Sequence, residues 1–516
     1  MNLAELFDRN YERFGEYESL IWLPEGEKEI RITNLDMLRE SKRLAQALRD
    51  LGVERGDSIA VFLPNSPEVI VTYRAAWQIG AVAVPILFHL SEGEARYILE
   101  HSETVVVITN EDLYETIASA SHGLDRLEHI ILIDGERDKG VLYRDLLSKS
   151  RELPAPVDMK ENETAVMIYT AGTTGKPKGV MLSHLNLLCN AMSCFEHNYF
   201  PEQEDIRTLT NLFVLPLCHS YGLIVSNLGA LTGTMSVMLP RFDTKAVFRA
   251  IENYKIKSLS AVPAMYSMLL QAPEADHHDT SSMELWNSGS APLSVELIRQ
   301  FEAKFTGRIY EGYGLSEASP SVSAHHRKMK TKPGSVGAPL PGVSVRVVDY
   351  NDQDVDVNEI GELLVRGDNV MKGYYKMPEK TADVLRGGWL HTGDMARIDE
   401  EGYIFIMERK DDMIIRGGEN IYPRELEEVI WSHDAVLEAA VISLPDNIMG
   451  EKVVAVVVPQ SGKYLTEDNI KDFCRGKVAK FKIPGAVLVL DALPRNAIGK
   501  VLKKELRLMA QERFQS

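Results

Sequence analysis

The sequence predicts a multi-domain α/β protein with a large N-terminal domain of α/β layers, a β-barrel-like subdomain and a small α+β C-terminal domain. Three observations support this fold class. A chain of 516 residues is too long for one hydrophobic core. Strand and helix patterns alternate through its first part, as in parallel α/β layers. After about residue 330 the pattern changes to short β runs, and beyond about 411 to a compact mixture of strands and helix.

The first elements are short and well delimited. Thr33–Asp36 resembles a capping box, so we expect a helix to follow it. Ser58–Leu63 and Ala81–Ile86 read as apolar strands with a helix at Glu68–Ile79 between them. Further strands are expected at 105–109 and 129–133. Gly222–Leu239 has no charged side chain, but a Gly-Thr break divides it, which predicts a buried helix followed by a buried strand and no membrane span.

The later elements are mostly strands. The runs at 344–348, 362–365 and 402–406 predict a sheet or barrel-like piece. The small C-terminal unit is predicted from strands at 439–443, 453–458 and 486–490 and a helix at 467–478. No Gly/Ser linker precedes that unit, so composition alone does not set its boundary.

Composition limits the possible partners and the compartment. The net charge of −18 argues against a general binder of nucleic acid or anionic membranes. Four cysteines in a chain of this length, with no C-x-x-C pair, predict reduced thiols and neither a zinc nor a dithiol site. With an N-terminus that lacks the apolar core of a secretory signal, we expect a cytoplasmic protein. The oligomeric state is not predicted.

The most informative segment is the loop Thr170-Ala171-Gly172-Thr173-Thr174-Gly175-Lys176-Pro177-Lys178-Gly179, which follows an apolar, β-branched run. Glycines leave backbone N–H groups accessible, threonines add hydroxyls and lysines add positive charge, so the segment suits a polyphosphate. It does not fit the Walker A pattern, because its glycines are too close and Pro177 follows Lys176.

This loop resembles the phosphate loop of the acyl-adenylate-forming superfamily, which includes acyl-CoA synthetases, peptide-synthetase adenylation domains and luciferases. Other segments are similar to the superfamily's motifs in the same order along nearly the whole chain. They are 215–222, 288–292, 310–317, 388–394, 409–420 and 494–500. Two positions depart from those motifs: Ser316 replaces a threonine, and Glu408 stands before Arg409 where glycine is usual.

The resemblance implies an AMP-forming carboxylate–CoA ligase. ATP and an acid give acyl-AMP and pyrophosphate, and the thiol of coenzyme A then displaces AMP. It also implies domains 1–410 and 411–516 with a hinge at Asp411, and a mobile C-terminal domain that rotates between the two steps.

The resemblance assigns roles to single residues. Lys500 would bridge the carboxylate and the α-phosphate, and Lys500, His219 and Thr174 are the catalytic candidates. Glu317 would hold Mg²⁺, which prefers hard oxygen ligands. Asp394 and Arg409 would contact the ribose. The expected contacts of ATP/AMP and coenzyme A are Thr170, Gly172, Thr173, Thr174, Gly175, Lys178, Gly289, Ser290, Ala291, Glu311, Gly312, Tyr313, Ser316, Asp394, Arg409, Gly417 and Gly418.

The acid is less well defined by the sequence. The expected acyl pocket contains His219, Tyr221, Ser288, Gly312 and Ala318, and with little charge among them we expect an aryl, alicyclic or medium-chain acid. Three alternatives stay open: a stand-alone adenylation enzyme that loads a carrier protein, a luciferase-like oxidative enzyme, and an inactive nucleotide sensor.

Overall fold

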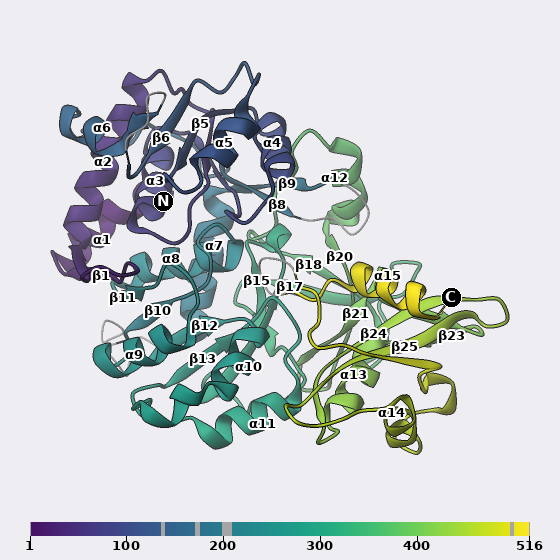
Figure 1. Cartoon of the computed structure of the whole chain (residues 1–516). Helices are drawn as coiled ribbons and strands as arrows, with labels where there is room; N and C mark the ends of the chain where they lie inside the picture. Colours follow the sequence, from purple (N-terminus) through teal and green to yellow (C-terminus); the bar gives the residue numbers. More distant parts are fainter. Residues whose placement is uncertain (1, 136–139, 171–175, 199–208, 496–499, 515–516) are drawn as a thin grey trace.

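The computed structural model describes residues 2–135, 140–170, 176–198, 209–495 and 500–514. Two large sheets form most of the N-terminal part (Figure 1). The first sheet has the order β19-β9-β8-β4-β3-β5-β6-β7, and β3 to β8 pair in parallel. Its strands are β3 (Ser58–Val61), β4 (Val82–Pro85), β5 (Thr104–Thr109), β6 (His129–Leu132), β7 (Val141–Leu142), β8 (Thr164–Thr170), β9 (Lys178–Ser183) and β19 (Gly373–Tyr374).

The second sheet has the order β16-β15-β14-β13-β12-β10-β11-β1-β2, with a parallel centre. Its strands are β1 (Glu18–Trp22), β2 (Ile30–Thr33), β10 (Asn211–Phe213), β11 (Ser236–Met238), β12 (Ser258–Ala261), β13 (Leu285–Ser288), β14 (Arg308–Gly314), β15 (Ser321–Ala324) and β16 (Ala338–Pro339).

Helices cover the sheets in layers because successive strand residues face opposite sides. On one face of the first sheet, Ala60 and Val107 pack against Ile98 and Ile117, which belong to α4 and α5. The helices of these layers are α1 (Leu6–Phe14), α2 (Asn34–Asp50), α3 (Pro67–Gln78), α4 (Glu92–His101), α5 (Tyr114–Ser121), α6 (Tyr143–Lys149), α7 (His184–Asn198), α8 (Ser220–Thr232), α9 (Thr244–Tyr254), α10 (Pro263–Gln271) and α11 (Val295–Lys304).

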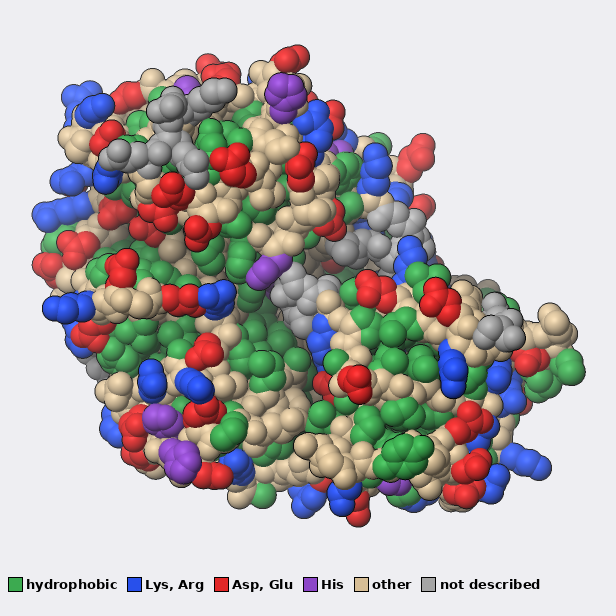
Figure 2. Space-filling view, in the orientation of Figure 1, with side chains coloured by type: hydrophobic (Ala, Val, Ile, Leu, Met, Phe, Trp, Pro, Cys, Tyr) green, Lys and Arg blue, Asp and Glu red, His purple; other side chains and the backbone are tan. Residues whose placement is uncertain are grey.

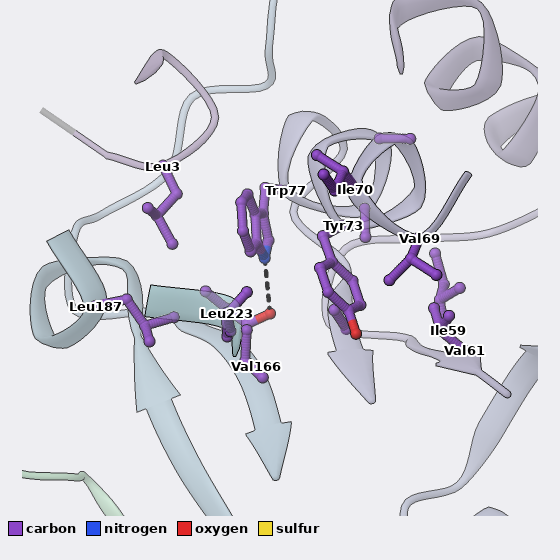
Figure 3. Close-up of a cluster of buried hydrophobic side chains, with 14 of the residues drawn as sticks. Leu3, Ile59, Val61, Val69, Ile70, Tyr73, Trp77, Val166, Leu187 and Leu223 are labelled. Carbon is purple, nitrogen blue, oxygen red and sulfur yellow. Dashed lines mark hydrogen bonds between the residues drawn. The ribbon is translucent and has the colours of Figure 1, made fainter. Parts of the chain in front are cut away.

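The largest core lies on the other face of the first sheet. There Ile59 and Val61 pack with Trp77 of α3, Leu187 of α7 and Leu223 of α8 (Figure 3). The Trp77 indole N–H also donates to the Ala165 carbonyl at 3.0 Å, so this large side chain is buried with its polar atom satisfied. The same core reaches Phe213 and Met238 of the second sheet, so α7 and α8 lie between the two sheets.

The far face of the second sheet has its own core. Trp286 of β13 and Leu259 of β12 pack with Phe248 of α9, Tyr266 of α10 and Phe301 of α11. The predicted parallel α/β layers are therefore confirmed. The capping box at Thr33 and Asp36 starts α2, and the uncharged stretch 222–239 forms α8 and β11. In the described part of the chain, no helix is long and apolar enough to cross a membrane.

The remaining sheets follow in chain order. A four-stranded antiparallel sheet consists of β17 (Ser344–Val348), β18 (Gly361–Arg366), β20 (Leu390–Ile398) and β21 (Ile404–Arg409). The helix α12 (Pro378–Val384) lies between β19 and β20 in the chain. The β runs after residue 330 thus form an open sheet, the simpler of the two predicted arrangements.

A small C-terminal domain completes the fold (Figure 1). It has the hairpin β22 (Ile414–Arg416) and β23 (Glu419–Ile421), and the sheet β24 (Val436–Asp446), β25 (Gly450–Pro459) and β26 (Ala486–Val489). One face of this sheet packs on α13 (Pro423–Trp431) and α14 (Glu467–Cys474). The other packs on α15 (Lys503–Phe514).

Candidate active site

A cavity of about 2090 Å³ lies where the strand ends of the large sheets meet the C-terminal domain. In Figure 2 the surface is hollowed near the centre of the view, along the junction with that domain. Lysine and arginine side chains line it although the protein is acidic overall: Lys178, Arg409 and Lys500 are among them. Carboxylates such as Glu317 and Asp394 line it as well, so the cavity offers cations for a polyanion together with acceptors for hydroxyl groups or a metal ion.

The phosphate-loop candidates fall at a β-hairpin. Thr170 ends β8 and pairs with Lys178, the first residue of β9. Both residues line the cavity. Gly172, Thr173, Thr174 and Gly175 lie outside the described residues.

A tyrosine joins Lys178 to the candidate metal ligand. The Tyr374 hydroxyl donates to Glu317 Oε1 at 2.8 Å, and Lys178 Nζ lies 3.3 Å from that hydroxyl and 4.3 Å from the ring centre. Burial lowers the pKa of Lys178, while the nearby Glu317 charge opposes this shift. Tyr374 belongs to none of the motifs in the sequence, and only the pairing of β19 with β9 brings it to the site.

A buried carboxylate, Asp394, is part of the cavity wall. Asp394 on β20 is opposite Arg409 on β21, and its Oδ1 accepts from Arg409 Nη1 at 3.1 Å. Its Oδ2 accepts from the Tyr313 hydroxyl at 2.5 Å. Asp394 is 6% exposed, and burial raises its pKa, while the charges of Arg409 and Lys500 oppose that rise.

The ends of β13 and β14 lie side by side and form another wall. Ser288 pairs with Glu311, and the Ser288 hydroxyl, buried at the cavity, has no hydrogen-bond partner among the described residues. Ser290 has φ +71°, which is uncommon for a residue other than glycine. Position 314 has no room for a side chain, because a Cβ on Gly314 would lie 2.0 Å from the Pro320 carbonyl oxygen. Gly289, Ala291, Gly312, Tyr313 and Ser316 also line the cavity.

Glu311 is buried between the two domains and is only 2% exposed. Its Oε1 accepts from the Leu293 amide at 3.3 Å and lies 3.8 Å from Arg424 Nη2 of α13. Burial raises the pKa of Glu311 to about 7, although Arg424 opposes the shift.

The acyl-pocket candidates meet at the start of α8. His219 is its N-cap, and Nδ1 accepts from the Tyr221 amide at 3.3 Å. Burial lowers the pKa of His219 to about 4, so at neutral pH the ring is uncharged and carries its proton on Nε2. The Tyr221 ring lies against Gly289, and Ile224, Val225 and Leu228 extend an apolar lining along α8.

Three predicted residues lie elsewhere. Ala318 packs in the hydrophobic core instead of lining the cavity, because it faces away from it on the short turn 316–318. Gly417 and Gly418 lie in the exposed turn between β22 and β23, with φ +62° and +88°, and do not line the cavity in this domain arrangement.

The fold and the cavity together define the class of protein. Layered α/β sheets carry a small domain over a cleft lined by both basic and acidic side chains. The structure superimposes on ATP-bound MatB from Rhodopseudomonas palustris with a TM-score of 0.90, 32% identity and full coverage of both chains. This is the two-domain fold of adenylate-forming enzymes.

The chain belongs to the family of AMP-binding enzymes, whose sequence profile matches residues 7–375, and the profile of the family's C-terminal domain matches residues 425–500. It is 36% identical to a long-chain-fatty-acid–CoA ligase of Bacillus subtilis, with 92% of this chain and 90% of the relative covered. It is 35% identical to a feruloyl-CoA synthase of Amycolatopsis, with 92% and 93% covered.

These relatives confirm the predicted class, an AMP-forming CoA ligase, and do not favour the carrier-loading alternative.

Proposed function

We propose that this enzyme activates an apolar carboxylic acid with ATP and transfers the acyl group to coenzyme A. The observation that carries the proposal is the convergence of Lys178, Arg409 and Lys500 with two carboxylates, Glu317 and Asp394, on one cavity that continues into an apolar lining. Free carboxylates resist nucleophiles because of their charge and poor leaving group, and conversion to a mixed anhydride with AMP removes both obstacles.

The nucleoside would bind between β14 and β20. Asp394 would accept hydrogen bonds from the ribose hydroxyls, which ionised carboxylates hold well. The Tyr313 and Arg409 side chains already orient this carboxylate, so little reorganisation is needed. The backbone at Gly289, Ser290 and Ala291 and the ring of Tyr313 would flank the adenine.

The triphosphate would lie along the hairpin of β8 and β9. Thr170 and Lys178, with the loop between them, would hold the β- and γ-phosphates. No cluster of three metal-binding side chains occurs in the described part of the chain, and the single carboxylate of Glu317 fits Mg²⁺, which keeps most of its coordination for phosphates and water. A bound Mg²⁺ would neutralise charge on the departing pyrophosphate.

The first step is the attack of the substrate carboxylate oxygen on the α-phosphorus, with loss of pyrophosphate. Lys500 would neutralise the charge that develops between the carboxylate and the α-phosphate. His219 is uncharged at neutral pH, and its Nε2–H would donate to the bound acid or its adenylate.

The second step needs a different lid. Rotation of residues 411–516 about Asp411 against 1–410 would withdraw Lys500 and bring Gly417 and Gly418 to the site, where their missing side chains would leave room for pantetheine. The thiolate of coenzyme A then attacks the acyl carbon, and AMP leaves with the bonding electrons. The position of both glycines on an exposed turn supports this exchange.

The apolar lining along α8 and the Tyr221 ring favour an aryl, alicyclic or medium-chain acid. The two relatives act on a long-chain fatty acid and on ferulate, which also supports an apolar acid. None of the four cysteines forms a disulfide, which supports the reducing cytoplasm as the compartment.

The deciding experiment measures acyl-CoA formation with benzoate, cyclohexane carboxylate and straight-chain acids from C4 to C12. We expect the highest kcat/KM with one of these acids and a much lower value with acetate. A strong preference for acetate would contradict the pocket assignment, and a chain that forms no acyl-CoA or acyl-AMP from any acid would contradict the proposed function.

A further inference from the structure

In the wall of the cavity, a lysine is held between two largely buried glutamates. Lys503 Nζ lies 2.7 Å from Glu408 Oε2 and 3.3 Å from Glu427 Oε1. The side chains are 17%, 10% and 8% exposed, respectively, so water screens these charges little. We call these three residues the Lys503 cluster. The site described above assigns it no role.

The members of the Lys503 cluster lie on both sides of the proposed hinge. Glu408 is in β21, before Asp411, whereas Glu427 in α13 and Lys503 at the start of α15 come after it. A rotation about Asp411 therefore carries Glu427 and Lys503 together and leaves Glu408 behind. The pair Lys503–Glu427 survives the rotation, and the shorter pair Lys503–Glu408 cannot.

Arg424 makes two further contacts across the hinge, and among the described residues these are longer or involve no pair of charges. Arg424 Nη2 is 3.8 Å from Glu311 Oε1, beyond hydrogen-bond distance. Arg424 Nη1 donates to the Ile406 carbonyl at 2.9 Å. The Lys503–Glu408 pair, at 2.7 Å and largely buried, is the stronger electrostatic tie.

The same tie fixes the base of the segment that carries Lys500. Lys503 is three residues further along the chain. Between them, Val501 bridges to Arg495, and the Leu502 amide donates to the Pro494 carbonyl at 2.9 Å. The position of Lys503 therefore limits where Lys500 can lie.

We propose that Glu408 is a positioning residue for the adenylation step: through Lys503 it holds Lys500 at the cavity, and breaking this pair accompanies the change to thioester formation. The inference rests on the proposed function. It also gives a physical role to the glutamate that replaces the expected glycine before Arg409, since glycine has no carboxylate to pair with Lys503.

The test compares the two half-reactions in Glu408→Gln, which keeps the shape of the side chain and removes its charge. We expect kcat for ATP–pyrophosphate exchange to fall about tenfold with little change in the KM for ATP, as for the loss of one hydrogen bond between charged groups. Single-turnover acyl-CoA formation from added acyl-AMP should stay equal or rise. A merely structural defect would lower both rates. Lys503→Gln, which removes the same pair from the other side, must shift the ratio of the rates in the same direction.

Two further variants complete the test. Glu408→Asp keeps the charge and should keep exchange within about threefold of wild type. Arg507→Gln is the matched control. Arg507 lies one turn after Lys503 in α15 and pairs with Asp412 at 2.6 Å. Both partners come after the hinge, so the rotation does not break this pair. Arg507→Gln should leave the ratio at the wild-type value.

If the ratio of exchange to acyl-CoA formation is unchanged in Glu408→Gln, whether or not both rates fall, the role of Glu408 is overturned. Failure of the wild-type protein in both assays would instead overturn the proposed function.

Discussion

Asp394 offers the sharpest test of the nucleotide site. Asp394→Asn keeps the size of the side chain, and Asn can still accept from the Tyr313 hydroxyl. It removes the negative charge that faces Arg409 and would receive the ribose hydroxyls. We therefore expect weaker binding of ATP with little change in the chemical step.

The magnitude follows from the burial of this carboxylate, which is 6% exposed. A hydrogen bond to a charged group contributes ~1.5–3 kcal/mol, which corresponds to a rise of about 10- to 150-fold in the KM for ATP. The assay is ATP–pyrophosphate exchange at saturating acid, with ATP varied.

Glu362→Gln is the matched control for that measurement. Glu362 is also buried in the four-stranded sheet and pairs with Lys410 at 3.0 Å, but it does not line the cavity. Its KM for ATP should stay near the wild-type value. An unchanged KM in Asp394→Asn, or an equal rise in both variants, would refute the assignment of Asp394 to the ribose.

Three further predictions concern the lysine, the hinge and a buried acid. Lys500→Ala should lower acyl-adenylate formation by about a hundredfold or more, whereas Lys463→Ala, an exposed lysine of the same domain away from the cavity, should not; pyrophosphate release measures both. Asp411→Pro should keep adenylation and block thioester formation, because proline fixes φ; a variant with both half-reactions intact would contradict the hinge. Glu311 has a pKa raised from 4.5 to about 7 by burial, so the folded state holds its proton where the unfolded state has lost it. The free energy of unfolding should therefore fall by ~3 kcal/mol through this group as the pH rises from about 4.5 to 7. Thermal unfolding of Glu311→Gln should show a smaller fall over that range. Parallel stability curves for wild type and Glu311→Gln would contradict the burial of an ionisable Glu311.

The layered α/β fold and the order of its elements could be predicted from local patterns in the chain. Apolar runs such as Ser58–Val61, broken by turn residues, are local signals, and the capping box at Thr33 starts its helix with contacts three residues apart. Ala318, expected at the acyl pocket, packs in the hydrophobic core, because the direction of a side chain on a short turn depends on the packing around it.

The contacts between residues far apart in the chain could not be predicted in this way. Tyr374 reaches Glu317 because β19 adds to the edge of β9, and Lys503 reaches Glu408 because α15 folds back beside β21. Neither contact leaves a periodic or motif-like trace in the chain. Hydrophobic patterning records whether a residue faces a core, whereas pairing between charged or hydroxyl groups far apart in sequence depends on how whole sheets and domains are arranged.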